Sequence, residues 1–242
     1  MTNPQRHRPR FDTAFRRQIS AACLAGALLV VVGVGTGCTP FPPEAAERTQ
    51  ASPIVVAAPT IPTGTRGAMN FDDGYVKIGT GKKTVEVWLD PMCAECRSFA
   101  QTSLPSLFTD GLEERATLRI HPVAVQAGQA PEADYSTRAS AMLAAIAAEE
   151  PSKAIEFLRA LYEHQPASND PGLSDQQLQD LAREVGVEST FSDLTGYREW
   201  VAQATATAGS KTSHLPAVTV DDKPFSGHVD DPEEFAAFYR ED

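Results

Sequence analysis

The chain has 242 residues, 42% of them hydrophobic, which is enough to bury one sizeable core and leaves room for accessory segments. Its formal charge is −11, and the 16 basic and 31 acidic residues that follow residue 37 give −15. Because an acidic surface repels a phosphate backbone, we expect no nucleic-acid partner.

Residues 1–37 have the pattern of an export signal. Five arginines precede an uncharged run from Ile19 to Val34. The run ends in VGTGCTP, which resembles the cleavage and lipidation box of bacterial lipoproteins, although Gly35 stands where that box usually has leucine. Two alternatives stay open: a signal peptide that is removed while Cys38 receives a lipid, or an uncleaved membrane anchor. Both predict a domain on the outer face of the cell membrane.

Residues 38–66 predict a tether rich in proline and alanine. Six of the chain's 18 prolines lie between Thr39 and Arg66, and no strand or helix period is visible there. Since proline lacks a backbone donor and favours extended chain, we expect a spacer between the membrane and a domain at residues 67–242.

The domain begins with two predicted strands, residues 75–78 and the apolar, β-branched stretch TVEVWL at 84–89. A helical pattern follows, with Phe99, Leu104 and Leu107 at helical spacing. The stretch ATLRIHPVAV, residues 116–125, predicts the second parallel strand of a βαβ unit.

Between the central strand and the helix the chain reads DPMCAEC, with Cys93 and Cys96 two residues apart. The unpaired amides and the positive dipole end at a helix N-terminus stabilise a thiolate, and the spacing lets the second thiol resolve a mixed disulfide. Cys23 lies in the apolar run and Cys38 in the lipidation box, so the exported domain keeps only this pair. In an oxidising compartment such a pair persists as a disulfide unless it is reduced.

Four roles are open to the pair: a working dithiol, a stable disulfide in a binding module, a metal clip, and two inert buried residues. The histidines of the exported part are scattered singly, whereas a structural zinc site needs four close ligands. We therefore expect no metal and favour the working dithiol.

The remaining sequence alternates between a helical block and a short β-hairpin. Apolar residues recur at helical spacing over 135–148, 154–162, 178–185 and 197–206, and Ser174 with Gln177 resembles a capping box. LPAVTV, a turn at residues 221–222 and KPFSG predict the hairpin, and residues 232–239 a closing helix. The order βαβ, helical block, ββα predicts an α/β, thioredoxin-like fold with an all-helical insertion at about residues 130–208.

Three stretches resemble the DsbA-like thiol-disulfide oxidoreductases, in the branch of exported or membrane-tethered actinobacterial proteins: DPMCAEC; YSTRASAMLAAI with EFLRALYEHQP and GLSDQQLQDLAREVG; and SHLPAVTVDDKPFSG. The resemblance implies that Cys93 is the nucleophile, Cys96 the resolving thiol, and Leu215-Pro216 the cis-proline loop that faces them. It also implies that the backbone of Leu215 pairs with an extended substrate. No cofactor is needed, because the disulfide itself carries two electrons.

The sequence departs from the family's strong oxidants at two positions. Ala94 and Glu95 stand between the cysteines where those oxidants carry Pro-His. At an effective dielectric of about 40, a carboxylate about 6 Å from the Cys93 sulfur raises the pKa of the thiol by roughly one unit, which makes the disulfide less oxidising. Leu215 is larger than the threonine or valine that many relatives carry, and it has no hydroxyl. This predicts either a narrower groove or a changed rate of mixed-disulfide release.

Besides Glu95, two residues are candidate modulators, His214 and Glu86. His214 is two residues before the loop proline, so it either favours the thiolate or faces solvent. Glu86 lies near the usual position of a proton-relaying acid, but Val87 occupies that position, so a solvated or hydrogen-bonded acid at the strand end is the preferred interpretation. Asp90 predicts a turn or helix-capping role. Trp88 and His121 are interpreted as packing residues beside the site.

The predicted function is thiol-disulfide exchange with exported polypeptides, supported by a membrane redox partner. The alternative is a membrane-tethered, non-catalytic module in which the Cys93–Cys96 disulfide is permanent. The direction of exchange stays open. A monomer is expected, because no dimerisation segment is apparent before the domain.

Overall fold

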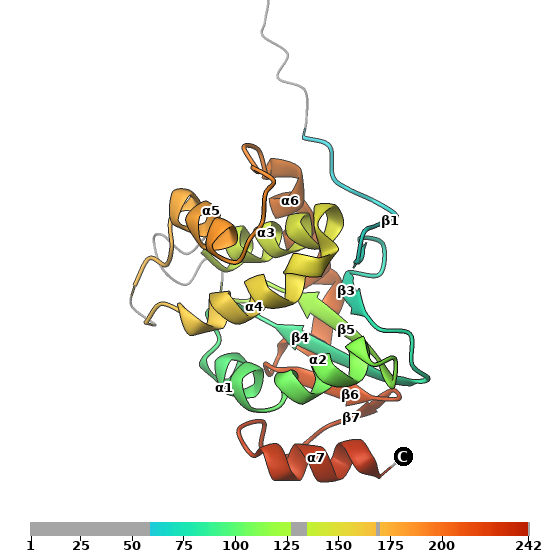
Figure 1. Cartoon of the computed structure of the whole chain (residues 1–242). Coiled ribbons are helices and arrows are strands. Elements are labelled where there is room, and N and C mark those ends of the chain that lie inside the picture. The colour runs from blue at the N-terminus through green and yellow to red at the C-terminus, as the bar shows by residue number, and fades with distance from the viewer. Residues whose placement is uncertain (1–58, 127–134, 168–169, 242) are drawn as a thin grey trace, which may run out of the picture. The chain divides into compact units, whose positions relative to one another are not determined.

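The computed structural model describes residues 59–126, 135–167 and 170–241. The predicted signal segment, Cys38 and most of the tether lie outside these residues. Within them, one mixed sheet has the strand order β1-β2-β3-β5-β4-β6-β7 (Figure 1). The strands are β1 Thr65–Arg66, β2 Met69–Asn70, β3 Tyr75–Ile78, β4 Lys83–Leu89, β5 Ala116–Pro122, β6 Ala217–Val220 and β7 Lys223–Pro224.

The centre of the sheet is the predicted βαβ unit. Strands β4 and β5 pair in parallel and are joined by helices α1 (Ala94–Thr102) and α2 (Leu104–Leu112). The sequence predicts one helix here, but the structure has two, because Pro105 has no amide hydrogen with which to continue the helix through Ser103. Strands β3 and β6 flank the pair and run antiparallel to it.

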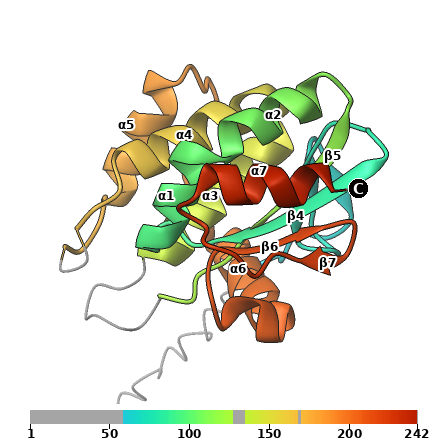
Figure 2. The ribbon, with the colours of Figure 1, turned by 90° about the horizontal axis from the view of Figure 1, so that it is seen from below.

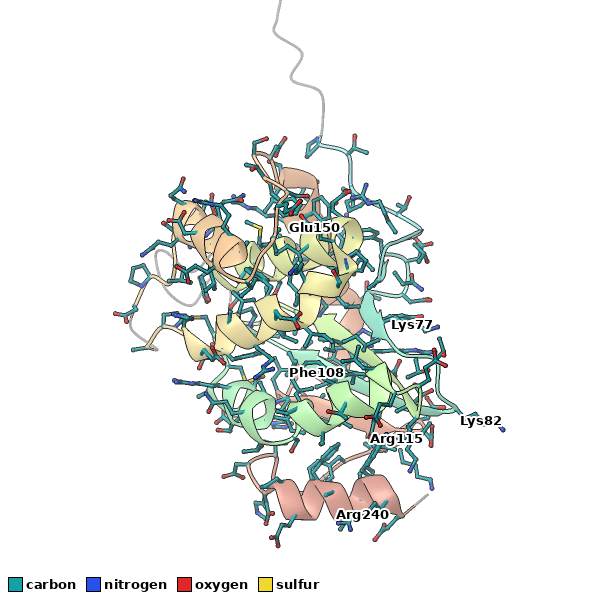
Figure 3. All side chains as sticks on the ribbon, viewed as in Figure 1. Lys77, Lys82, Phe108, Arg115, Glu150 and Arg240 are labelled. Atoms are coloured by element: carbon teal, nitrogen blue, oxygen red, sulfur yellow. A yellow bond between two sulfur atoms is a disulfide. The ribbon has the colours of Figure 1, made fainter. Side chains whose placement is uncertain are left out.

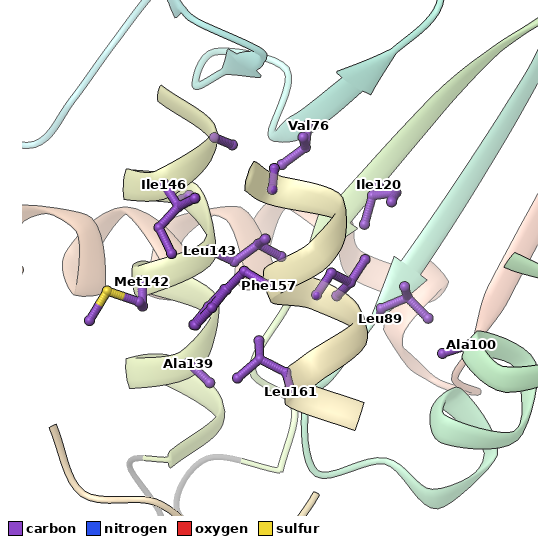
Figure 4. Close-up of a cluster of buried hydrophobic side chains, with 14 of the residues drawn as sticks. Val76, Leu89, Ala100, Ile120, Ala139, Met142, Leu143, Ile146, Phe157 and Leu161 are labelled. Atoms are coloured by element: carbon purple, nitrogen blue, oxygen red, sulfur yellow. The ribbon is translucent and has the colours of Figure 1, made fainter. Parts of the chain in front are cut away.

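One face of this sheet forms the main core. Val85, Val87 and Leu89 alternate along β4 and are 2% exposed or less. Figure 4 shows Leu89 of β4 in the cluster that Leu143 and Phe157 build from the helical block. Charged side chains lie outside this core: in Figure 3, Lys82 points away from the molecule whereas Phe108 lies within it.

The helical insertion is confirmed between β5 and β6. Its helices are α3 (Tyr135–Glu149), α4 (Ala154–Glu163), α5 (Asp175–Glu184) and α6 (Thr195–Ala208), with short 3₁₀ turns η1 (Pro151–Lys153) and η2 (Gly209–Thr212). The Ser174 hydroxyl accepts a hydrogen bond from the Gln177 amide, and the Gln177 side chain accepts one from the Ser174 amide, so the capping box is confirmed. Among the described residues no helix combines the length and apolarity that a membrane crossing needs.

The C-terminal half closes the fold as predicted. The hairpin of β6 and β7 turns at Asp221 and Asp222, whose φ angles of 44° and 66° are both left-handed, as a two-residue type I′ turn requires. Helix α7 (Pro232–Arg240) follows. The ring of its Phe235 lies edge-on to the ring of Phe99 in α1, with 5.1 Å between the ring centroids. Figure 2 shows α7 beside α1 and α2, with α6 on the other side of β4 and β6.

The sequence does not predict strands β1 and β2. They pair across Gly67, which has a φ of +56°, and a Cβ at that position would lie 2.5 Å from the carbonyl oxygen of Ala147. The Ala68 amide donates a 2.8 Å hydrogen bond to the same carbonyl oxygen, which holds this turn against α3. Strands of two residues are too short to show an alternating pattern, so the sequence does not reveal them. The folded domain therefore begins slightly before Gly67.

Candidate active site

The two cysteines form a disulfide at the start of α1. Cys93 is the N-cap of the helix, and its sulfur accepts a 3.0 Å hydrogen bond from the Cys96 amide. Cys96 is 0% exposed and Cys93 is 4% exposed, so Cys93 is the sulfur that a partner thiol can reach. The amides at the helix start are positioned to stabilise a thiolate on Cys93 once the disulfide opens.

The loop before β6 faces this disulfide. The Cys93 sulfur lies 3.5 Å from the carbonyl oxygen of Leu215, and the Leu215–Pro216 peptide bond is cis, as the resemblance implies. A hollow of about 370 Å³ opens between the two segments; it is lined by Cys93, Glu95, Val125, Gln126, Thr212, Ser213, His214 and Leu215. We call it the redox hollow.

Two of the predicted modulators lie in the redox hollow. Glu95 is exposed, and its Oε2 atom is 3.9 Å from the Cys93 sulfur, closer than the separation estimated from the sequence. His214 is also exposed and lines the same hollow. The structure thus brings Cys93, Glu95, His214 and Leu215 together, and their roles in exchange stay predictions.

Glu86 lies on the sheet face opposite to Val87. Its carboxylate is 3.7 Å from the His121 imidazole and 3.1 Å from the Arg119 guanidinium. These two neighbours, His121 first, outweigh partial burial and lower the pKa of Glu86 from 4.5 to about 2. Such an acid stays ionised at neutral pH, which favours the hydrogen-bonded strand acid over a proton relay.

Asp90 is a turn residue, as predicted: its carbonyl oxygen accepts a 3.0 Å hydrogen bond from the Cys93 amide, whereas the cap of α1 is Cys93 itself. The Asp90 side chain is 0% exposed and accepts hydrogen bonds from the Met92 amide at 2.8 Å, the Gln126 amide at 2.9 Å and the Ser136 hydroxyl at 2.6 Å. Burial raises the pKa of Asp90 although these donors oppose it. The carboxyl group thus joins the active-site turn to α3 and to the segment after β5.

Two residues of the insertion also hold the active-site turn. The Gln165 side-chain amide donates to the carbonyl oxygens of Pro91 at 2.8 Å and Cys93 at 2.9 Å. The Tyr162 hydroxyl donates to the Asp90 carbonyl oxygen at 3.2 Å. Sequence reasoning missed both contacts, because Gln165 follows α4 in a non-periodic stretch and carries no motif of its own.

The family model described as thioredoxin matches residues 79–238, which contain the disulfide, the helical insertion and the cis-proline loop. The chain belongs to the thioredoxin family. This membership, together with the paired cysteines, confirms the predicted enzyme class: a thiol-disulfide oxidoreductase with a thioredoxin-like fold.

Solved structures share the fold of this thioredoxin-family chain. Reduced DsbG from Mycobacterium tuberculosis is 21% identical with a TM-score of 0.60, over 69% of this chain and 86% of that one. Reduced DsbA from the same organism is 19% identical with a TM-score of 0.56, over 69% and 98%. Oxidised BdbD from Bacillus subtilis is 18% identical with a TM-score of 0.55, over 74% and 97%.

Curated relatives match part of the chain. Serine/threonine-protein kinase PknE of Mycobacterium tuberculosis is 28% identical over 149 residues, which are 59% of this chain and 26% of the kinase. The chain thus spans about a quarter of the length of the curated relatives it matches, and we carry no kinase activity over to it.

Proposed function

We propose that this thioredoxin-family protein exchanges disulfides with exported polypeptides on the outer face of the cell membrane. The observation that carries the proposal is the placement of the Cys93 sulfur, which lies at a helix start, lines the redox hollow and is 3.5 Å from the Leu215 carbonyl oxygen. Its partner, Cys96, is fully enclosed. The Cys93 sulfur is thus accessible to a substrate, whereas the Cys96 sulfur is enclosed beside it and can resolve the mixed disulfide.

In the oxidising direction, a substrate thiolate attacks the Cys93 sulfur and forms a mixed disulfide. The Cys93–Cys96 bond breaks, and Cys96 leaves as a thiolate. A second substrate thiolate then attacks the substrate sulfur of the mixed disulfide, and Cys93 leaves as a thiolate that the amides of the helix start stabilise. Two electrons pass from the substrate to the protein, so this exchange needs no metal or organic cofactor. The reverse sequence reduces a substrate disulfide.

The backbone of Leu215 supports the choice of a polypeptide substrate. An extended chain that pairs with this loop gains main-chain hydrogen bonds, which give affinity with little sequence preference. The exposed Glu95 beside the sulfur supports a less oxidising disulfide than that of the strong oxidants in the family. A membrane redox partner would reset the pair after each exchange, and we propose that the protein acts as a monomer.

The direct test measures the redox equilibrium of the pair. The purified protein is held in defined glutathione or dithiothreitol buffers, and alkylation of Cys93 and Cys96 is quantified by peptide mapping so that other thiols do not contribute. A potential above about −180 mV supports net oxidation of exported proteins, and one below about −250 mV supports a reductase fed by a membrane donor. A pair that does not equilibrate within hours contradicts exchange and leaves the non-catalytic binding module.

A trapping experiment identifies the attacking sulfur. The Cys96→Ala variant should accumulate a mixed disulfide with exported polypeptides, because the resolving thiol is missing. The Cys93→Ala variant is the matched control and should accumulate far less, since Cys96 is 0% exposed. Equal trapping by both variants contradicts the assigned roles.

The membrane attachment requires its own test. We propose that Cys38 carries a lipid, with the uncleaved anchor as the alternative. Metabolic labelling with a fatty acid should mark the protein, and Cys38→Ala should abolish the label whereas Cys23→Ala should not. Unlabelled protein that remains in the membrane fraction would favour the anchor.

A further inference from the structure

Helix α6 lies on one side of β4 and β6 (Figure 2). A second cavity, of about 470 Å³, is lined by residues of α6, β4 and β5. It opens between the turn after β2, the ends of β4 and β5, and α6 with η2. Its walls include both tryptophans of the chain, Trp88 and Trp200, together with Phe71 and His121. We call it the aromatic cavity. Its volume is in the range of pockets that bind small groups.

The aromatic cavity offers flat rings to a ligand. Trp88 stacks on His121 with 4.2 Å between the ring centroids and 8° between the planes. Phe71 and Trp200 meet edge-on at 5.5 Å, and the Trp200 indole nitrogen donates to the Phe71 carbonyl oxygen at 2.8 Å. These contacts fix the rings before a ligand arrives, which lowers the entropy cost of binding.

The charges of the aromatic cavity favour a cation. Asp72 and Asp73 line it and are exposed. The ammonium nitrogen of Lys211 stands 4.8 Å from the centre of the Trp88 ring, so this indole face already accepts a positive charge. Lys211 is itself exposed and can turn to solvent when another cation enters. Asp72, Asp73 and Lys211 together give the lining one net negative charge, which disfavours an acidic ligand.

The aromatic cavity adjoins the redox hollow along two segments of chain. Lys211 lines the first and Thr212 the second, and these residues are consecutive. Val123 lines the cavity and Val125 lines the hollow. The Ala124 amide between them donates to the Thr205 hydroxyl of α6 at 3.0 Å, which fixes this wall. A polypeptide extended along Leu215 therefore reaches the aromatic cavity within a few residues.

We infer that the aromatic cavity binds a basic side chain, preferentially arginine, of the polypeptide whose cysteine reacts at Cys93. The inference rests on the proposed function and adds a substrate preference to it. A guanidinium group is planar, so it stacks on an indole while its N–H groups pair with Asp72 or Asp73. The Leu215 backbone would supply sequence-independent affinity, and the aromatic cavity would select basic segments that flank the cysteine.

The first experiment measures binding without redox chemistry. Short peptides carry serine in place of the reactive cysteine and either arginine, citrulline or glutamate a few residues away. They are titrated into the full-length protein, and tryptophan fluorescence reports binding because both tryptophans line the cavity. We expect the arginine peptide to bind about five-fold more tightly than the citrulline peptide, which has the same shape without the charge. The preference should shrink in about 0.5 M salt.

The decisive variant is the double substitution Asp72→Asn, Asp73→Asn. In the native protein Asp72 accepts a hydrogen bond from the Gly64 amide, and Asp73 accepts one from the Asn70 side chain. Asparagine retains a side-chain oxygen that can accept the same bonds, so the fold is preserved. The control, Asp222→Asn with Asp230→Asn, removes the same charge from exposed positions outside the cavity. The arginine preference should disappear in the first variant and persist in the control. A preference that survives in the first variant overturns the inference.

The second experiment uses peptides whose cysteine is held in a disulfide with thionitrobenzoate. The Cys93 thiolate of Cys96→Ala protein attacks the peptide sulfur, and the absorbance of the thionitrobenzoate that leaves gives the rate of mixed-disulfide formation. The arginine peptide should react several-fold faster than the citrulline peptide at low salt. Exchange at equal rates, together with equal binding, overturns the aromatic cavity as a substrate site while the proposed function stands. An arginine preference in binding without any exchange contradicts the proposed function instead, so the two failures are distinguishable.

Discussion

The Ser136 hydroxyl donates a 2.6 Å hydrogen bond to the Asp90 carboxylate and thereby joins the first turn of α3 to the turn that carries Cys93. Both side chains are at most 1% exposed. Together with the Gln165 bonds to the carbonyl oxygens of Pro91 and Cys93, this contact joins the active-site turn, residues 90–93, to the helical insertion. The insertion therefore acts on the geometry of the redox site as well as on the core.

Replacement of Ser136 by alanine should lower the free energy of unfolding by about 1–3 kcal/mol, because the buried Asp90 carboxylate loses a donor that water cannot replace. Urea denaturation measures the change. Ser106→Ala is the control: its exposed hydroxyl makes a local bond to the Ser103 carbonyl oxygen, and its loss should cost under about 0.5 kcal/mol. Equal losses of stability in the two variants would contradict a stabilising role for the Ser136–Asp90 hydrogen bond.

Asp90 should make stability fall as the pH rises above 3.8. Burial raises the pKa of this carboxyl in the folded protein above its ordinary value of 3.8, so the folded state holds the proton over a pH range in which the unfolded state has lost it. Stability then declines with pH until the folded pKa is passed. Unfolding measured across this range should show that decline in the wild type and lose this contribution in Asp90→Asn. An unchanged pH profile in the variant would refute the assignment.

Glu95→Gln should make the disulfide more oxidising. The carboxylate lies 3.9 Å from the Cys93 sulfur and opposes formation of the thiolate there. Its neutralisation should lower the pKa of the Cys93 thiol in the reduced protein by about one unit and raise the potential by about 30 mV. Absorbance of the thiolate against pH and equilibration with glutathione measure the two quantities. Glu184→Gln on the exposed end of α5 should change neither.

Local sequence patterns were sufficient to predict the parts of the fold that depend on near neighbours. The alternation of Val85, Val87 and Leu89 predicts β4, and the cysteines that follow it open α1 as expected. The capping box at Ser174 fixes the start of α5. These features arise from contacts within a few residues, so periodicity and capping chemistry reveal them.

The supports of the redox site depend on tertiary contacts that no local pattern contains. Asp90 and Ser136 are 46 positions apart, and Gln165 and Pro91 are 74 positions apart. The aromatic cavity likewise forms only when α6 brings Trp200 to the sheet face that carries Trp88. The sequence predicts the strand and the helices that hold these residues, but their pairing follows from how the insertion packs on the sheet. The sequence therefore predicts the turn at Asp90 but not the bonds from Gln126 and Ser136 to its carboxylate.

Glu86 should stabilise the fold above pH 4.5 and lose that effect as the pH falls to about 2. His121 and Arg119 lower its pKa in the folded protein from 4.5 to about 2, so the unfolded state takes up the proton first. The side chain is 19% exposed, and its contribution at neutral pH is at most about 3 kcal/mol. Glu86→Gln should remove this contribution, so that the free energy of unfolding depends less on pH between 4.5 and about 2. Glu156→Gln, at an exposed position on α4, should keep the wild-type profile.

Gly172→Ala should destabilise the protein by more than about 2 kcal/mol, because two costs act at this position. Its φ is +79°, which strains any residue with a Cβ, and that Cβ would lie 2.4 Å from the ring of the buried Tyr135 at the start of α3. Gly64→Ala separates the two costs, since Gly64 has a φ of +72° with open space around the added methyl group. It should cost only about 1 kcal/mol. Thermal and urea unfolding measure the stability of both variants. Equal losses of stability would contradict the steric cost and show that the Tyr135 ring moves to accommodate the methyl group.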